Sequence, residues 1–548
     1  MSKYFISLVL VLTLTFAKTS FGQVENVPLS HPVYHFLKHL HIKGLIPEKS
    51  FFRLPFTKKE IQKILLDIFE NPSDLNSVEK KQLENFLVEF ELKPKENAVF
   101  IPSETDSVQV ISLNLFSHRD KYIYHYKDNK NSVAVKPLGS IRSVFRLDNG
   151  NSENAFYGNL GFRVYGTIDT IFGYYLQATN GKFLSGSRQL GIQEDKTLAN
   201  SIKFTLLNSD FDLVESHIRY EKDWFFAGLS RETRLIGSGV FQDLVISDNA
   251  PPMDEFYAGV SFRNFKYTFS HFGLVAEPRD SIQFGSSADI PQKFMVLHSA
   301  TLQFRKLNLT YFQSIVYSGR GIEIAYLNPF TFLKSVEHSL RDRDKASLGF
   351  AIEWNFLPNF QVAGTWMLED LMFSKIGKNY WSNKTAWNIG VFYASEFSTD
   401  FGLEYTRVEP YMFTHFNRIN NRTNDGRLFG TYLYPNSDEL SFLIRVFALG
   451  RYPVILRISY QRHGANETDS TGRIIRNVGG DFRYVHTPTD SYYVTFLDGV
   501  RNDLLQVQFS LGYEIIRNFN FQLLWDYRKY QKQKGYFVFR FVFRFEDF

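Results

Sequence analysis

The C-terminal stretch GYFVFRFVFRFEDF, residues 535–548, alternates strictly between two kinds of side chain. Phenylalanine occupies every second position from Phe537 to Phe545, and the positions between them hold Val538, Arg540, Val542 and Arg544. Successive side chains of a strand point to opposite faces, so one face here is aromatic and the other carries two arginines. Such a strand at the end of a chain is typical of the closing strand of a membrane β-barrel. Because Phe548 is out of phase with the aromatic face, we expect the strand to end at Phe545.

The same alternation continues through residues 108–548. In 348–356, 505–513 and 521–527, one face is apolar and aromatic and the other is polar or small. A soluble β-sandwich also alternates, but its strands are nearer five or six residues, whereas tilted membrane strands need about nine to eleven. At about 24 residues for each strand and connection, the region would hold about 18 strands. We predict an all-β, antiparallel transmembrane barrel whose rings contact lipid and whose interior is hydrated.

The composition agrees with alternating membrane strands. The 56 phenylalanines and 30 tyrosines bring the aromatic content to 17%, yet the mean hydropathy is only −0.23, as expected when polar residues separate the apolar ones. Cysteine is absent, which excludes disulfides and thiolate chemistry. The net charge of +5 is mild and forms no concentrated basic stripe, so no nucleic-acid partner is expected. This charge is compatible with an anionic glycan.

The N-terminus has the pattern of an export signal. Residues 1–22 combine a basic start, an apolar run from Ile6 to Phe16, and small residues at Ser20 and Gly22, as in a secretory signal peptide. The apolar run is too short to cross a bilayer, and no other segment approaches the roughly 20 apolar residues that a membrane helix needs. We expect a Sec-exported protein that is integral to the bacterial outer membrane through its strands.

Residues 24 to about 95 have helical periodicity and predict a small module of three amphipathic helices. The helix boundaries are marked by Pro32 and Gly44, by capping-box spacing of Thr57 and Glu60, and by the same spacing of Asn76 and Glu79. A bundle this small must lay its remaining apolar surface against something larger. The predicted organisation is therefore a signal peptide at 1–22, a periplasmic or plugging helical module at 23–107, and a barrel at 108–548.

Signals for catalysis or metal binding are weak. His31, His35, His39 and His41 cluster in the helical module, but neither the metalloprotease spacing nor a cysteine accompanies them. A packing or solvated role is the better interpretation, so we expect no metal and no cofactor. Nucleophile elbows, P-loops and dinucleotide fingerprints are also absent from the sequence. We expect a protein that is not an enzyme, although catalytic residues on neighbouring strands would leave no sequence signal.

The segment KIGKNYWSNKTAWN, residues 375–388, concentrates aromatic rings and lysines between two predicted strands. Aromatic faces stack on sugar rings, and nearby cations neutralise acidic sugars. The candidate polysaccharide-binding residues are Tyr380, Trp381, Trp387, Lys378 and Lys384. The alternative interpretation is that these rings belong to the interfacial girdle of the barrel.

Several segments resemble the capsule-assembly Wzi family of outer-membrane proteins, especially its Bacteroidetes-type members. They are SRETRLIGSGVFQDLVISDNAPP at 230–252, YSGRGIEIAYLNPF at 317–330, the acidic strand end at 366–370, EYTRVEPYMFTH at 404–415, and the loop at 432–440. The resemblance spans most of the barrel, with a departure at Arg234 to Gly237, where a tryptophan–glycine pair is expected. It implies an 18-stranded barrel with a periplasmic helical module, acting in attachment or assembly of surface polysaccharide rather than in catalysis.

The resemblance also singles out lumenal polar residues, which are Arg231, Arg234, Arg320, Glu323, Asn328, Glu369, Asp370, Glu404 and Arg407. Glu404 and Arg407 are expected on the inward side of one strand. These charges either pair to fix a plug and the strand register, or bind sugar directly. The expected partners are surface or capsular polysaccharide and outer-membrane lipids, and the sequence predicts no particular oligomeric state. Two other functions stay open: a channel or porin for small solutes or glycans, and a membrane-embedded lipid-modifying enzyme.

Overall fold

The computed structural model describes residues 22–93, 99–100, 116–117, 119–201, 209–277, 290–447, 450–531 and 533–546. Residues 1–21 of the predicted signal peptide, the predicted boundary between 107 and 108, and Phe548 lie outside these ranges. Within the described residues, no helix is both long enough and apolar enough to cross a membrane.

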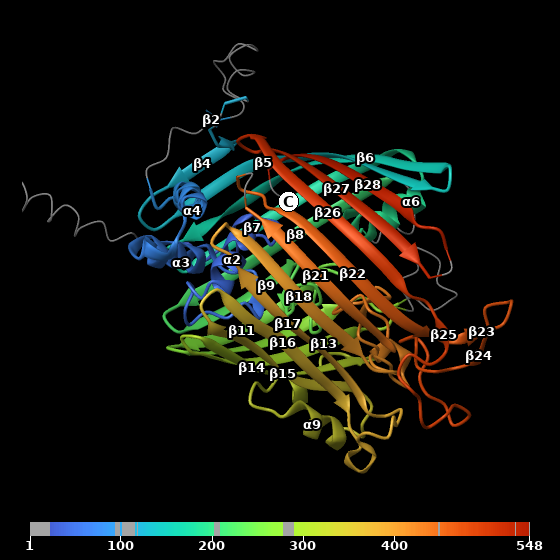
Figure 1. Cartoon of the computed structure of the whole chain (residues 1–548). Helices are drawn as coiled ribbons and strands as arrows, with labels where there is room; N and C mark the ends of the chain where they lie inside the picture. The colour runs from blue at the N-terminus through green and yellow to red at the C-terminus, as the bar shows by residue number, and fades with distance from the viewer. Residues whose placement is uncertain are drawn as a thin grey trace, which may run out of the picture.

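Eighteen long antiparallel strands form one closed barrel, which confirms the predicted fold class (Figure 1). The strands are β5 Ser132–Asp148, β6 Asn151–Ile168, β7 Phe172–Gly186, β8 Asp210–Lys222, β9 Phe225–Glu232, β11 Met253–Phe262, β12 Phe265–Leu274, β13 Lys293–Gln303, β14 Leu307–Ser318, β15 Lys345–Leu357, β16 Phe360–Asp370, β17 Lys384–Ala394, β18 Thr399–Val408, β21 Ser437–Val446, β22 Val454–Ala465, β26 Leu504–Ile516, β27 Phe519–Tyr530 and β28 Tyr536–Phe545. β28 pairs with β5 and closes the ring. It ends at Phe545, as predicted.

Shorter elements lie at the ends of the barrel and in the loops. The short strands are β1 Arg53–Leu54, β2 Val99–Phe100, β3 Lys121–Tyr122, β4 Tyr124–Lys127, β10 Leu235–Ile236, β19 Thr423–Asn424, β20 Arg427–Leu428, β23 Glu467–Thr468, β24 Ile474–Arg476 and β25 Val500–Arg501. The loop helices are α6 Arg188–Glu194, α7 Lys196–Ala199 and α9 Leu333–Ser339, with 3-10 turns η1 Pro72–Asp74, η2 Ile324–Tyr326, η3 Phe373–Lys375 and η4 Arg418–Asn420.

The burial of side chains follows the predicted alternation. On β15, Phe350 and Trp354 are 55% and 45% exposed, whereas Ala351 and Glu353 between them are buried. The outer surface of the wall is therefore apolar and aromatic, as lipid requires, and the barrel is an integral outer-membrane structure.

The two ends of the barrel differ in the length of their connections. Short turns such as 169–171, 223–224 and 517–518 join the strands at one end, and long loops such as 319–344 and 409–436 join them at the other. Outer-membrane barrels have short periplasmic turns and longer extracellular loops. The short-turn end is therefore periplasmic.

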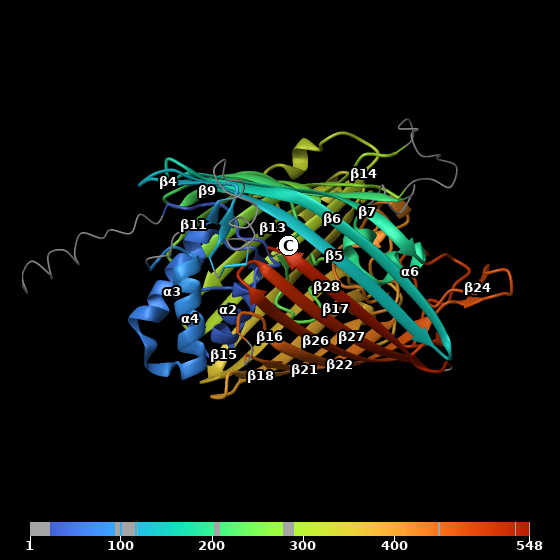
Figure 2. The same ribbon diagram turned by 90° about the horizontal axis from the view of Figure 1, so that it is seen from above.

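The helical module lies at the periplasmic end (Figure 2). Its helices are α2 Val33–Ile42, α3 Lys58–Glu70 and α4 Ser77–Glu89, and both predicted capping boxes are present. Buried Leu37, Leu65 and Phe86 belong to its apolar core. The side chain of Gln82 donates to the carbonyl of Gly450 in a periplasmic turn, at 2.8 Å. The module therefore has its own core and is also bonded to the rim of the barrel.

Two extracellular loops, 233–252 and 409–436, fold inward and fill the lumen. Val245 and Phe429 from these loops pack with the inward wall residues Met295 and Phe312 in one buried cluster. β10 of the first loop pairs with β1 of the helical module, so the plugs from the two ends meet inside the barrel. The prediction of a hydrated interior is wrong where these two loops pack, because their apolar residues cover the inward wall.

A buried ionic cluster attaches the helical module to the wall. His39 on α2 lies 2.5 Å from Asp400 on β18 through Nδ1 and 2.9 Å from Glu79 on α4 through Nε2. Lys43 Nζ also lies 2.8 Å from Glu79. Burial alone would lower the pKa of His39, but its hydrogen bonds to the two carboxylates outweigh burial and raise this pKa above the ordinary value.

The charge on His39 predicts a pH-dependent attachment of the module. Because its folded-state pKa is raised, the stabilisation is complete below about pH 6.5 and is lost as the pH rises through the folded-state value. We expect His39→Ala, which removes one of the partners of each carboxylate but leaves Lys43 beside Glu79 and Arg445 beside Asp400, to destabilise the docked module by roughly 2 kcal/mol. It should also remove the loss of protection that accompanies a rise in pH through the folded-state pKa of His39. Hydrogen exchange of the α2 amides in reconstituted protein measures both effects.

The matched control is His338→Ala on α9, where the histidine side chain is exposed. Equal α2 protection in the His39 variant, the control and the unmodified chain at every pH would show that the cluster does not hold the module.

Candidate functional site

Two extracellular loops meet above the barrel wall. The connection 371–383, between β16 and β17, contacts the connection 466–499, which follows β22. Tyr380 and Tyr493 form an isolated β-bridge, the Trp381 amide donates to the Tyr492 carbonyl at 3.1 Å, and the Val494 amide donates to the Asn379 carbonyl at 2.9 Å. These backbone bonds give the junction of the two loops a fixed register.

Six rings gather at this junction, and we call them the aromatic loop cluster: Tyr380, Trp381, Tyr411, His486, Tyr492 and Tyr493. The His486 ring stacks on Trp381 at 4.1 Å between centroids and 9° between planes. Burial lowers the pKa of His486 and so favours the neutral form of this ring. Tyr492 and Tyr493 are 48% and 51% exposed and present the cluster to the extracellular side.

Lysines accompany these rings. Lys375 Nζ lies 5.7 Å from the centre of the Tyr380 ring and 3.0 Å from the hydroxyl oxygen of Tyr493. This hydrogen bond lowers the pKa of Tyr493. Lys378 is exposed in the same loop. Lys384 is instead buried, with its Nζ 5.2 Å from the centre of the Trp381 ring, so it supports the cluster from within.

The structure separates Trp387 from the other candidate sugar-binding residues. It lies on β17 between the inward-facing Ala386 and Asn388, and its ring is 5.3 Å from that of Tyr405 on the outward face of β18. The interpretation as part of the interfacial girdle therefore fits Trp387. The sugar-binding interpretation is left to Tyr380, Trp381 and Lys378, which lie in the loop.

Three of the singled-out polar residues lie inside the barrel and bind the inward loops or the wall. Glu404 accepts hydrogen bonds from the backbone amides of 240–242, the shortest being 2.7 Å from Val240. Glu369 accepts from the Phe413 amide at 2.9 Å and pairs with Lys345. Arg234 lies 2.8 Å from both Glu232 and Glu255. Buried charges need such partners, and here the partners fix the position of the plug.

Two arginines expected in the lumen lie on the outward face instead. Arg407 is three residues from Glu404, and odd spacing in a strand places side chains on opposite faces. It bonds Glu409 at 2.6 Å and stacks on Phe496 at 3.7 Å. Arg231 alternates with buried Ser230 and Glu232 and pairs outside with Asp254 at 3.0 Å.

The remaining singled-out residues lie at the extracellular ends of strands, not in the lumen. Arg320 pairs with Asp344, and its Nε lies 3.2 Å from Glu323. Asn328 is exposed in the same loop, 319–344. Asp370 ends β16 and lies 3.5 Å from Lys384. The prediction that Arg320, Glu323 and Asn328 lie in the lumen is wrong because the loop after β14 does not turn inward.

A groove of about 460 Å³ opens on the extracellular side and was not predicted from the sequence. Its lining includes Tyr434, His463, Arg483, Tyr484 and Tyr530. These residues come from β22, β27 and two loops, and no common motif connects them. Only the closed topology brings them together.

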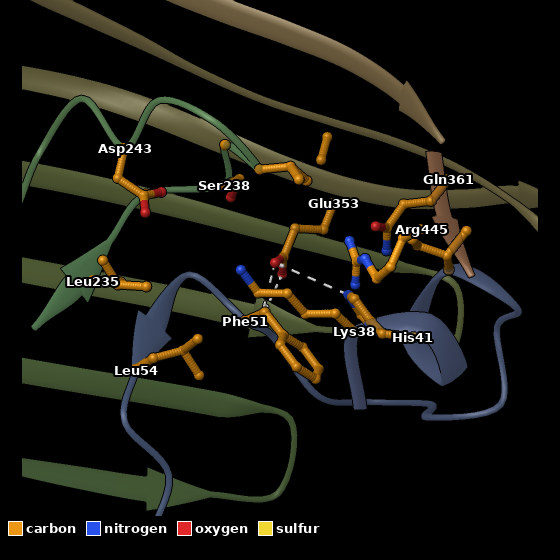
Figure 3. A pocket seen from close by; sticks show the side chains of 15 residues that line it. Lys38, His41, Phe51, Leu54, Leu235, Ser238, Asp243, Glu353, Gln361 and Arg445 are labelled. Carbon is orange, nitrogen blue, oxygen red and sulfur yellow. Dashed lines mark hydrogen bonds and ion pairs between the residues drawn. The ribbon is translucent and has the colours of Figure 1, made fainter. Parts of the chain in front are cut away.

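A second, internal cavity lies where α2 meets the inward loop 233–252 (Figure 3). Lys38, His41 and Arg445 face Glu353 there, and Glu353 accepts from the Phe51 amide at 3.0 Å. Burial raises the pKa of Asp243, on the inward loop, to about 7 and lowers that of His41 to about 3. The space available to the centres of water molecules is about 40 Å³, enough for a few waters but not for a sugar.

The four N-terminal histidines do not converge on one point. His39 binds two carboxylates, His41 stacks on Phe51 at 4.4 Å, and His31 lies 3.2 Å from Glu89. Packing and ion pairing account for these three rings.

The fold and its plugs define an outer-membrane β-barrel protein with a closed lumen and an aromatic extracellular surface. No family model matches the chain, and no curated protein matches it. Among solved structures, the fold is similar to Wzi, an outer-membrane protein involved in group 1 capsule assembly in Escherichia coli and a carbohydrate-binding β-barrel. The TM-score is 0.57 and the identity 11%, over 95% of this chain and 98% of that one.

Other solved structures are similar at lower scores. Acinetobacter baumannii OccAB4 and Pseudomonas aeruginosa OprD both give a TM-score of 0.42, with 10% and 8% identity over 76% and 75% of this chain and 97% and 94% of theirs. The similarity to Wzi confirms the fold that the sequence resemblance implied, and at 11% identity it concerns the fold alone.

The amide bonds to Glu404 predict how the inward loop is held. We expect Glu404→Gln to weaken the loop by roughly 2 kcal/mol, because hydrogen bonds to a charged acceptor are lost. Hydrogen exchange of peptides covering 237–246 should become faster. Glu467→Gln, which removes a partly exposed partner of Arg476, is the control and should leave these peptides unchanged. Unaltered exchange in the Glu404 variant would contradict this role.

Proposed function

We propose that the protein is a non-enzymatic outer-membrane barrel that binds or helps organise an exported surface or capsular polysaccharide. The observation that carries this proposal is the aromatic loop cluster at the extracellular end, with Tyr492 and Tyr493 half exposed and Lys375 beside them. Exposed rings on a fixed loop junction suit the apolar faces of sugar rings. Lys375 and Lys378 suit acidic groups on the same polymer.

Each contact of this kind is weak, and a repeating polymer compensates for that weakness. A ring stacked on an apolar face contributes about 1 kcal/mol. Several such contacts to one chain add through effective concentration, because the second contact is made by an already bound polymer. The groove lined by Tyr434, Arg483 and Tyr484 offers a further contact zone on the same side. The similarity in fold to Wzi, a carbohydrate-binding barrel, also supports the proposal.

The packed lumen argues against the alternative of an open channel. The inward loops and β1 of the helical module fill the centre of the barrel with buried residues, among them Phe52, Ile236 and Phe413. An open pore needs a continuous wet path, which this core interrupts. The similarity to porins at a TM-score of 0.42 adds no argument for conduction.

The role of the exposed rings is tested by comparing two tyrosines of equal exposure. Tyr493 in the cluster and Tyr513 on the outward face of β26 are each 51% exposed. We expect Tyr493→Ala to weaken binding of labelled polysaccharide by about fivefold, as loss of about 1 kcal/mol implies, and Tyr493→Ala with Trp381→Ala to weaken it further. Tyr513→Ala and Trp387→Ala should bind normally. Retention on cells and binding to protein in nanodiscs are the measurements.

Equal binding by the cluster variants and the outward-face variants, in correctly inserted barrels, would contradict polysaccharide binding at this surface.

Conductance separates the proposal from a channel. We expect the full-length protein to be silent in planar lipid bilayers, because packed residues interrupt the lumen. Sustained single-channel currents from the unmodified chain would instead support transport.

A further inference from the structure

The loop 319–344, which we call the outer strap, folds over the outside of the barrel. It contains η2 and α9, and Figure 1 shows α9 on the outer side of the strands β14 and β15. The other extracellular loops described above turn inward or remain at the mouth. The outer strap is therefore placed where lipid would otherwise contact the wall.

The burial of outward-facing residues beneath the strap shows this placement. Val296 on β13 and Ile315 on β14 alternate with inward residues of the lumenal cluster, yet both are 0% exposed. Outward residues on uncovered strands, such as Ile389 and Leu403, are 49% and 50% exposed. The covering side chains include Tyr326 and Leu333 of the strap, which pack with Val296 and Ile315 in a separate cluster.

Polar groups of the outward wall anchor the strap. The side chain of Gln313 on β14 donates to the carbonyl of Thr331 at 2.7 Å and accepts from the amide of Leu333 at 3.0 Å. The hydroxyl of Tyr267 on β12 donates to the carbonyl of Pro329. A wall that faced only hydrocarbon would leave these polar groups without partners. The strap and the wall therefore supply each other's hydrogen-bond partners.

The anchoring points set the depth of the strap. Gln313 lies five positions before the end of β14 at Ser318, which corresponds to about 12 Å below that end for a tilted strand rising about 3.3 Å per residue. Two positions further on the same outward face is Tyr311, whose ring is 5.4 Å from that of Phe350. Phe350, which pairs with Tyr311, is 55% exposed on the lipid-facing wall, so the anchoring point of the strap at Gln313 lies only two strand positions from the level at which the wall contacts lipid.

The outer surface of the strap is apolar at its tips and charged near its ends. Ile324 and Phe330 are 80% and 94% exposed, although both flank residues that are bonded to or buried against the wall. Arg341 and Arg343 are exposed at the end of the strap, and Arg343 lies 3.2 Å from Glu323. Apolar rings with cations nearby are typical of segments that lie in a membrane interface.

We propose that the outer strap is an interfacial lipid anchor, in which Ile324 and Phe330 contact acyl chains of the outer leaflet and Arg341 and Arg343 lie at the level of its phosphate-bearing headgroups. The occupant is lipid because the strap is continuous with the lipid-facing wall: the medium around Phe350 also surrounds Phe330. Phosphate groups complement the two exposed guanidinium groups.

The anchor has a consequence for the extracellular mouth. Lys334 on α9 lies 3.9 Å from Asp370, the last residue of β16 and the start of the loop that carries Tyr380 and Trp381. Phe373, in the same loop, is 81% exposed. Lipid contacts on the strap would hold this side of the mouth at the membrane surface. The anchor goes beyond polysaccharide binding and does not depend on it.

The absence of cysteine in the chain makes a direct test possible. Single variants Ile324→Cys and Phe330→Cys, carrying a nitroxide spin label, are reconstituted into bilayers of phosphatidylethanolamine and phosphatidylglycerol. The collision rate of the label with oxygen, which concentrates in hydrocarbon, is compared with that for a water-soluble nickel complex. Phe350→Cys on the outward wall is the lipid reference, and Ile475→Cys, at a residue 67% exposed on β24 in an extracellular loop, is the water reference.

We expect labels at 324 and 330 to resemble the label at 350, with an oxygen-to-nickel ratio several-fold above that at 475. Ratios equal to that at 475 would overturn the proposal. Spin–spin broadening at 330 that disappears on dilution with unlabelled protein would overturn it too, because a second copy would then be the occupant. Because the substituted side chains are exposed, we expect each variant to fold. Heat-modifiable migration on gels checks that each variant is a folded barrel.

Discussion

The structure depends on one constraint, that backbone polar groups inside a bilayer must find partners within the protein. Closure of the sheet meets it: β28 is bonded to β27 on one side and to β5 on the other, so neither the first nor the last long strand has a free edge. The aromatic face of β28 follows from the same constraint, because a closed wall in lipid has an apolar exterior. The other parts of the molecule pack against this closed sheet or extend from it.

A closed wall of 18 strands encloses a space that must be filled with water or with protein, and this chain fills it with protein. The filling comes from both ends and meets at the pairing of β1 with β10. Carboxylates on the inward wall hold it in place: Glu404 binds amides of loop 233–252, Glu369 an amide of loop 409–436, and Glu353 an amide of the helical module. The inward wall thus provides anchoring points for the filling that enters from both ends.

The sequence predicted those parts of the fold that depend on local periodicity. The phase of 348–356, the end of β28 and both capping boxes were confirmed, because strand and helix periods are properties of neighbouring residues. The candidate site was predicted in part: Tyr380, Trp381 and Lys378 share a loop, but His486, Tyr492 and Tyr493 join them from more than 100 residues away. The direction in which a loop folds after leaving a strand is a tertiary property. A local argument could therefore neither predict the packed lumen nor show that Arg320 lies outside it.

Departures from alternation carry the information that the regular strands lack. The runs FMVL at 294–297 and SIVY at 314–317 are apolar, or nearly so, on both faces, unlike the strands whose inward faces are polar or small. In the structure these runs lie between the two additions to the wall: Met295 and Val316 face the lumenal core, whereas Val296 and Ile315 face the outer strap. A strand covered by protein on both sides has no wet face, and for that reason it reads as a continuous apolar run. In a barrel sequence, such a run therefore indicates a plug on one side and a strap on the other.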